Sequence, residues 1–144
     1  MISERKRKTN MEKETNLFLL QLFYQCFHKI HMSQKYPGQG WLMILLRERG
    51  TLTQRELIEI TGRRSATLSE QLDSMDKAGL ITRGKNEEDR RNIDVTLTLL
   101  GRETAKDVEK ARQELSDKLF DKLDEVEKRQ LDIILKKLLS TFES

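Results

Sequence analysis

Basic side chains gather at two places in the middle of this 144-residue chain. One group precedes a polar run and the other lies in a charged loop; they are Arg63 with Arg64, and Lys85 with Arg90 and Arg91. Guanidinium groups make paired hydrogen bonds to phosphates and to guanine edges, so these residue types suit contact with a nucleic-acid duplex. Each phosphate that such a group neutralises adds to affinity, so the placement of charge matters more than its sum.

Asp89 lies two residues before Arg91 in the charged loop. Side chains two apart in an extended segment point to the same side, so the carboxylate can hold the guanidinium in place. An arginine held in this way fits a narrow minor groove, where it senses groove width and electrostatic potential. The competing interpretation is a surface ion pair worth under ~1 kcal/mol.

The elements that must position these residues begin at Thr53. Thr53 and Glu56 form a capping box, which predicts a short helix, and Gly62 allows the chain to turn after it. A second helix is predicted from Ser65, a good N-cap, to Gly79. Its inner face carries apolar residues at helical spacing, namely Leu68, Leu72 and Met75.

The outward face of this second helix is polar, as a helix lying in a major groove requires. Its candidate contacts to bases and phosphates are Arg63, Arg64, Ser65, Thr67, Ser69, Glu70 and Gln71. Gln71 can pair with adenine, while Glu70 can accept from cytosine or repel the phosphate backbone. For each of these residues the competing interpretation is a solvated surface position.

A two-stranded hairpin is predicted next. Leu80 to Arg83 form a short strand, and Ile93, Val95 and Leu97 alternate with polar residues on a return strand that has one dry face. Two helices followed by a hairpin with a charged loop are typical of a winged helix. The candidate wing contacts are Lys85, Asp89, Arg90 and Arg91.

The motifs of this region resemble the MarR family of bacterial transcriptional regulators. The resemblance lies in Gly79-Leu80-Ile81, in Glu88-Asp89-Arg90-Arg91, and in Val95, Leu97-Thr98 and Gly101. It implies a mainly α fold with a small β-hairpin wing, of the α+β class, in which N- and C-terminal helices form a dimerisation region. It also implies a homodimer that binds a pseudo-palindromic operator in double-stranded DNA as a repressor, and that a small-molecule effector releases.

The flanking segments complete the predicted organisation. Residues 1–12 are predicted to be a basic flexible arm, which is either a solvated tail or a segment that follows phosphates. Residues 13–35 are predicted to form an N-terminal dimerisation helix, because apolar side chains cover more of its circumference than one chain can bury. Residues 36–100 are the winged helix-turn-helix, and residues 101–144 are C-terminal dimerisation helices, the last capped by Asp124 and Glu127.

A short helix from Trp41 to Arg49 is predicted at the start of the winged helix-turn-helix. It is expected to offer four apolar side chains to the core, namely Trp41, Leu42, Leu45 and Leu46. Trp41 is interpreted as a core anchor rather than as a binding platform.

Composition limits the classes of function. One cysteine excludes an internal disulfide framework, and two histidines offer no metal-ligand spacing. No nucleophile–base pair or phosphate-binding glycine loop is present, so neither an enzyme nor a cofactor is predicted. The longest apolar run is too short to cross a bilayer and no signal-peptide pattern adjoins the basic N-terminus, which predicts a cytoplasmic protein without membrane contact.

The net charge of +3 does not come from the winged helix, because residues 51–100 carry eight Lys or Arg against nine Asp or Glu.

Three further hypotheses concern a ligand pocket, a cysteine sensor and a function other than DNA binding. Some family members bind small aromatic or phenolic anions in a cleft, and the candidate pocket residues here are Tyr24, His28, His31 and Tyr36. Others sense peroxides through a cysteine, which makes Cys26 an alternative sensor, although a cysteine on an apolar helix is usually buried as a small hydrophobe. The remaining alternative is a winged helix used only for protein–protein contact, without sequence-specific DNA binding.

Overall fold

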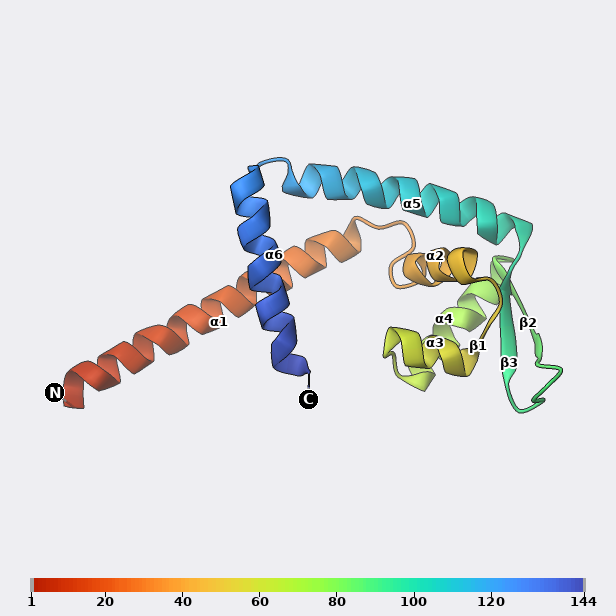
Figure 1. Cartoon of the computed structure of the whole chain (residues 1–144), viewed down its shortest axis with the longest axis horizontal. Coiled ribbons are helices and arrows are strands. Elements are labelled where there is room, and N and C mark those ends of the chain that lie inside the picture. Colours follow the sequence, from red (N-terminus) through yellow and green to blue (C-terminus); the bar gives the residue numbers. More distant parts are fainter. Residues whose placement is uncertain (1, 144) are drawn as a thin grey trace. The chain divides into compact units, whose positions relative to one another are not determined.

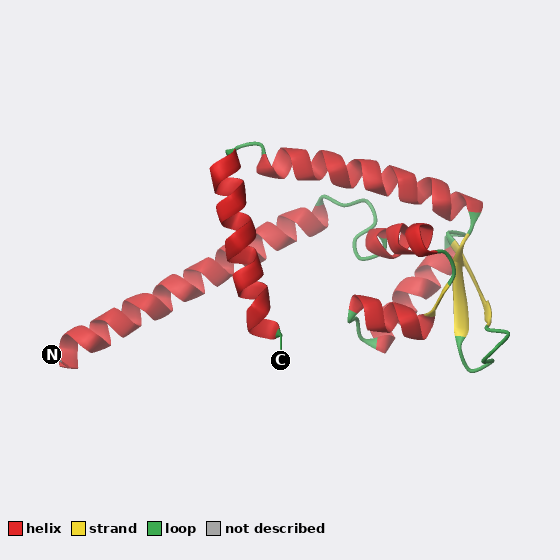
Figure 2. Cartoon of the chain, viewed as in Figure 1, coloured by secondary structure: helices red, strands yellow, loops and turns green. Residues whose placement is uncertain are grey.

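The computed structural model describes residues 2–143, so Met1 and Ser144, the ends of the first and last predicted segments, lie outside the described residues. The chain forms two compact units that separate between Gln39 and Gly40. The first unit holds helix α1 (Ile2–Met32) and the turn after it, and the second holds all the other described elements. Figures 1 and 2 show a mainly helical chain with one small sheet, as the predicted fold class requires.

Helix α1 begins at Ile2 rather than near residue 13, so residues 2–12 are helical instead of forming the predicted flexible arm. Straight-chain charged residues dominate this segment and favour a helix, and Thr9 Oγ1 bonds back to the carbonyl oxygen of Arg5 at 2.7 Å. Among its described side chains only Ile30 and His31 are even partly buried. The large apolar side chains left exposed along it include Leu17, Phe18, Leu19, Leu20, Leu22, Phe23, Tyr24 and Phe27.

Three helices of the second unit precede the hairpin: α2 (Gly40–Arg49), α3 (Gln54–Thr61) and α4 (Ser65–Lys77). The predicted capping box starts α3, since Thr53 Oγ1 accepts from the Glu56 N–H at 3.1 Å and Glu56 Oε2 accepts from the Thr53 N–H at 3.4 Å. Gly62 follows α3 with φ 67°, in the left-handed region that a residue without Cβ adopts freely. These local signals therefore fix the turn between α3 and α4 as predicted.

The sheet has three antiparallel strands in the order β1-β3-β2. Strands β2 (Ile81–Lys85) and β3 (Ile93–Leu97) form the predicted hairpin, while β1 (Leu52–Thr53) pairs with β3 through Leu52 and Val95. The prediction missed β1 because two residues are too few to show alternation. It was also wrong about Ile93, which is 39% exposed because it lies opposite Lys85 at the loop end of the hairpin.

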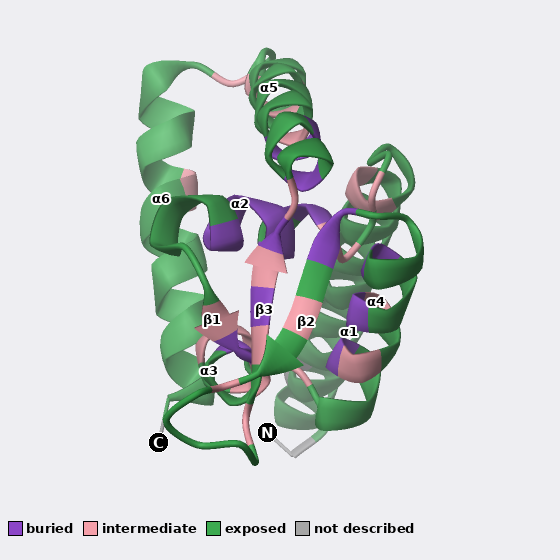
Figure 3. Cartoon of the chain, turned by 90° about the vertical axis from the view of Figure 1, so that its right-hand side faces the viewer, coloured by how far each residue is buried: buried purple, intermediate pink, exposed green. Residues whose placement is uncertain are grey.

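The core lies within the winged helix-turn-helix, where Figure 3 shows buried positions on α2, α4, β2 and β3 and at the start of α5 (Leu99–Phe120). Its largest fully buried side chains are Leu42, Met43, Leu57, Leu68, Leu72, Met75, Ile81 and Val95. Trp41 is not among them, and the prediction of a core anchor is wrong, because the indole is 43% exposed. Met43 and Ile44 are buried on α2 instead, so the short helix is apolar on more of its surface than predicted.

Helix α5 is followed by α6 (Glu125–Leu139) and a 3-10 turn (Ser140–Phe142). Asp124 and Glu127 cap α6 reciprocally as predicted, with Asp124 Oδ1 accepting from the Glu127 N–H at 2.8 Å. No residue of α6 is buried, and the apolar side chains it leaves exposed include Val126, Ile133, Ile134, Leu138 and Leu139. Among the described helices, none combines the length and the hydropathy needed to cross a membrane.

Candidate nucleic-acid interface

The loop between β2 and β3 is shaped by the side chain of Asn86. Asn86 Oδ1 accepts from the backbone N–H groups of Glu88 and Asp89, each at 2.9 Å, and its Nδ2 donates to Asp94 Oδ1 at 2.9 Å. The Asn86 N–H also donates to the carbonyl oxygen of Asn92 at 3.0 Å, which closes the loop. A charged loop without an apolar core is thus held in one shape by its own hydrogen bonds.

Asp89 contacts Arg91 through the backbone and the side chain. Its Oδ1 accepts from the Arg91 N–H at 3.1 Å and lies 3.6 Å from Arg91 Nε. The Arg91 side chain is 96% exposed, so its guanidinium projects from the wing while its backbone is fixed. Lys85 and Arg90 are exposed as well, which places all the predicted basic wing residues at the surface.

Helix α4 and the turn before it carry the second group of residues predicted to contact DNA. Its N-cap is Arg64, in extended conformation and without a side-chain cap, so the prediction that Ser65 caps the helix is wrong. The turn at Gly62 makes Ser65 the first helical residue, one position too late for its side chain to act as the N-cap. The predicted outward residues Arg64, Ser65, Thr67 and Glu70 are exposed, while Arg63, Ser69 and Gln71 are half-buried.

Arg63 differs from Arg64 because it is engaged within the protein. Arg63 Nη1 donates to Gln71 Oε1 at 2.6 Å, and its guanidinium carbon lies 5.6 Å from the centre of the Trp41 ring. Burial lowers the pKa of Arg63 below its ordinary value. The exposed indole of Trp41 is therefore a stacking surface for this arginine rather than part of the core.

Arg83 links the wing to helix α4, a role that the sequence reading did not assign. Its Nη2 lies 2.8 Å from Asp73 Oδ1 and its Nε 3.1 Å from Asp76 Oδ2. Partial burial acts to lower the pKa of Arg83, but hydrogen bonds to Asp73 and Asp76 and their negative charges outweigh it and raise that pKa. Strand alternation offered a signal, because Arg83 shares a face with buried Ile81 and pairs with buried Val95.

Replacing Arg83 by methionine is expected to loosen the wing relative to α4. The two carboxylates are 53% and 42% exposed, so solvent screens the pairs and the free energy of unfolding should fall by only about 1 kcal/mol. Affinity for DNA should fall more, by about fivefold to tenfold, because two contact elements must then be ordered on binding. Thermal unfolding and fluorescence anisotropy measure the two effects.

Arg83→Lys is the matched control for that change. It keeps one positive charge, which can pair with one carboxylate at a time, so its affinity should fall between those of Arg83→Met and the wild type. Unchanged affinity in Arg83→Met would contradict the positioning role.

The residues predicted to contact a small molecule lie in the first unit. Tyr24 and His28 are exposed, whereas His31 and Tyr36 are half-buried. Cys26, expected to be buried, is exposed on α1. These assignments stay predictions.

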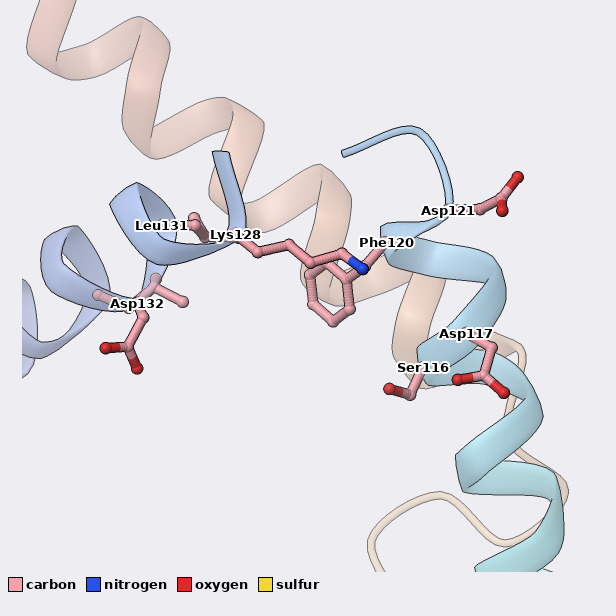
Figure 4. Close-up of a pocket in the computed structure, with 8 residues that line it drawn as sticks. Ser116, Asp117, Phe120, Asp121, Lys128, Leu131 and Asp132 are labelled. Atoms are coloured by element: carbon pink, nitrogen blue, oxygen red, sulfur yellow. The ribbon is translucent and has the colours of Figure 1, made fainter. Parts of the chain in front are cut away.

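A separate hollow of about 510 Å³ lies between the end of α5 and the first turns of α6 (Figure 4). Phe120, Leu131 and Leu135 give it an apolar lining, and charged side chains such as Asp117 and Lys128 surround them. None of the four predicted pocket residues lines it. Of its apolar lining, Leu135 is exposed, whereas Phe120 and Leu131 are half-buried.

Comparisons with known proteins agree with this geometry. The family model described as the MarR family matches residues 36–93. An uncharacterized HTH-type transcriptional regulator of Bacillus subtilis, YwhA, is 32% identical over 101 residues, which span 69% of this chain and 72% of that protein. Two solved structures share the fold: the S. aureus MepR–DNA complex (TM-score 0.78, 24% identity, 85% and 96% of the two chains) and a mutant MarR from E. coli complexed with operator DNA (0.74, 23%, 84% and 93%).

Proposed function

We propose that this chain, which belongs to the MarR family of winged helix-turn-helix transcriptional regulators, is a homodimeric repressor that binds a pseudo-palindromic operator and is released by a small-molecule ligand. Its relatives are named as transcriptional regulators, so the prediction that it is not an enzyme is confirmed. The observation that carries the proposal is the exposed Arg91 on a wing held by hydrogen bonds. The ion pairs of Arg83 connect this wing to the polar helix α4. Acting on chromosomal DNA would place the protein in the cytoplasm.

The wing supplies the minor-groove contact in this proposal. Arg91 would enter the groove, where negative potential is strongest, and its backbone is already fixed by Asp89. Lys85 and Arg90 would neutralise flanking phosphates. A preformed loop supports this role, because little conformational entropy remains to be lost on binding.

Helix α4 would lie in the adjacent major groove. Its candidate contacts divide by chemistry: Arg64 suits a guanine edge or a phosphate, and the exposed Ser65 and Thr67 and the half-buried Ser69 suit phosphates or bases. Glu70 can accept only from a donor such as cytosine N4, so it would disfavour guanine and thymine, which present only acceptors at its position. Arg63 and Gln71 would act together, because Arg63 donates a hydrogen bond to the Gln71 side chain.

The proposed homodimer rests on apolar surface that neither unit buries by itself. Phe23 and Phe27 on α1, and Ile134 and Leu138 on α6, are exposed in the single chain. Surface of this kind marks an interface, and a second copy of the chain is the partner that makes the assembly symmetric. Residues 13–35 and 101–144 would then form the dimerisation region. A twofold axis would place the two α4 helices on half-sites about 34–36 Å apart.

A small aromatic anion is the effector that we propose. Its candidate contacts are Tyr24, His28, His31 and Tyr36. Phe27 stacks on His31 with ring centroids 5.7 Å apart, and Lys35 Nζ lies 5.6 Å from the centre of the Tyr36 ring. Aromatic faces beside a cation suit an aromatic anion. Release through oxidation of exposed Cys26 is the alternative signal.

Selection of bound genomic fragments tests the proposal directly. The wild-type protein is expected to enrich a pseudo-palindromic sequence and to have a solution mass twice the 17.0 kDa of one chain. Transcription from a promoter that carries the enriched sequence should fall when the protein is added. Failure to bind any fragment at low salt, where electrostatic contacts are strongest, would instead favour a module for protein–protein contact.

A further inference from the structure

We infer that Arg63 fixes the side-chain amide of Gln71 so that helix α4 offers the groove a hydrogen-bond donor, which favours guanine and excludes cytosine. This inference rests on the proposed function, since it concerns which base the recognition helix reads. It replaces the two-bond pairing of Gln71 with adenine that the sequence alone allows. Arg63 itself thereby becomes a positioning residue rather than a base contact.

The geometry begins with the place of Arg63 just before α4. Residues 63, 67, 71 and 74 follow one another at helical spacing, so the Arg63 side chain can run along this strip past Thr67 to Gln71. Its Nη1 reaches Gln71 Oε1 at 2.6 Å. The Arg63 N–H donates to Thr61 Oγ1 at 3.3 Å, and its guanidinium lies over Trp41. Three elements thus hold the arginine in position.

The chemistry of the two groups determines which way the amide of Gln71 faces. A guanidinium has five N–H donors and no acceptor, so the amide oxygen must face Arg63. Rotation of the amide by half a turn would replace a charge-assisted hydrogen bond with two opposed donors. The NH₂ group therefore points away from Arg63. Gln71 makes no other side-chain hydrogen bond in the described part of the chain, so this donor is available to a ligand.

A donor facing the major groove distinguishes cytosine, which presents no acceptor there, from the other three bases. Guanine presents two acceptors there, N7 and O6, and thymine presents O4. A glutamine that pairs with adenine needs both its oxygen and its NH₂, because adenine offers N7 as an acceptor and its amino group as a donor. Since Arg63 holds the oxygen, Gln71 can make only half of that pairing. Cytosine presents only an amino group, which is a donor like the NH₂ of Gln71. The two donors cannot bond to each other, so cytosine is excluded.

The test compares base preference at one operator position. Fragment selection with Gln71→Ala first identifies the base pair at which preference is relaxed. At that pair the wild type is expected to bind guanine about tenfold more tightly than cytosine, which is the value of one good base contact. Arg63→Met should reduce that ratio toward one by freeing the amide to rotate. Arg63→Lys keeps a donor beside the oxygen and should retain most of the ratio.

Gln71→Glu is a second, nearly isosteric variant that does not depend on the loss of Arg63. Its carboxylate presents only acceptors, so preference at the identified pair should shift to cytosine, whose amino group donates. A purely structural role for Arg63 would lower affinity for all four bases alike. If the wild-type protein bound no DNA at all, the proposed function would be overturned. An unchanged preference in Arg63→Met, or no position that responds to Gln71→Ala, would overturn this inference alone.

Discussion

Arg91→Ala is expected to reduce operator affinity by about tenfold to a hundredfold while leaving the folded protein intact. The guanidinium is 96% exposed, and its contact with Asp89 is a long pair of 3.6 Å, so its removal should change the free energy of unfolding by less than about 0.5 kcal/mol. The loop itself should survive, because its hydrogen bonds run through Asn86 and the backbone. The whole loss would then come from the contact that Arg91 makes with DNA.

Fluorescence anisotropy with a selected operator fragment measures this loss, and a salt titration identifies its origin. If Arg91 neutralises one phosphate in the groove, the slope of log affinity against log salt should decrease by about one. Arg90→Ala is the matched control, since it removes the same charge from the neighbouring exposed position. Its affinity should fall less than that of Arg91→Ala. Equal affinity of Arg91→Ala and the wild type would refute insertion into the groove.

Gly101→Ala is expected to have the largest effect on stability. Gly101 is buried, and a Cβ at this position would lie 2.0 Å from the carbonyl oxygen of Leu80 and 3.0 Å from Leu97 Cδ2. The Leu80 oxygen cannot withdraw without cost, because it accepts from the Thr98 N–H at 3.0 Å. Overpacking against backbone should therefore lower the free energy of unfolding by about 3 kcal/mol.

Gly84→Ala is the control for that substitution, because its Cβ would meet nothing within 4 Å. Denaturant unfolding should leave Gly84→Ala within about 0.5 kcal/mol of the wild type and separate it clearly from Gly101→Ala. The same unfolding midpoint in both variants would mean that α5 can shift away from Leu80. In that case the close approach of the helix to the hairpin would not be required for stability.

The family motif thus contains residues of two kinds. Thr98 Oγ1 donates to the carbonyl oxygen of Gly79 at 2.6 Å and accepts from the Gly101 N–H at 3.0 Å, so the end of the motif joins α4, the hairpin and α5. Asp89 instead accepts a hydrogen bond from the Arg91 N–H within the wing, and the Arg91 side chain projects from the wing. One half of the motif builds the scaffold, and we expect the other half to contact DNA.

The sequence by itself was enough to predict the features that depend on interactions between residues close together in the chain. Capping boxes at Thr53 and Asp124, the turn at Gly62 and the apolar spacing of α4 involve residues within a few positions of one another, and each appears as predicted. The exposure of the wing arginines was equally predictable, because a charged loop cannot form core. The sequence missed the helical continuation through residues 2–12, where composition also suited a disordered tail.

Only the tertiary structure decided the contacts between elements. Arg83 meets Asp73 and Asp76 because β2 packs on α4 in one register, and Arg63, in the turn between α3 and α4, lies over Trp41 of α2. No local pattern contains this information, since strand register and helix packing are set by the whole buried core. The sequence therefore predicted the basic residues of the proposed interface, and the fold determined which of them are exposed and which contact other side chains.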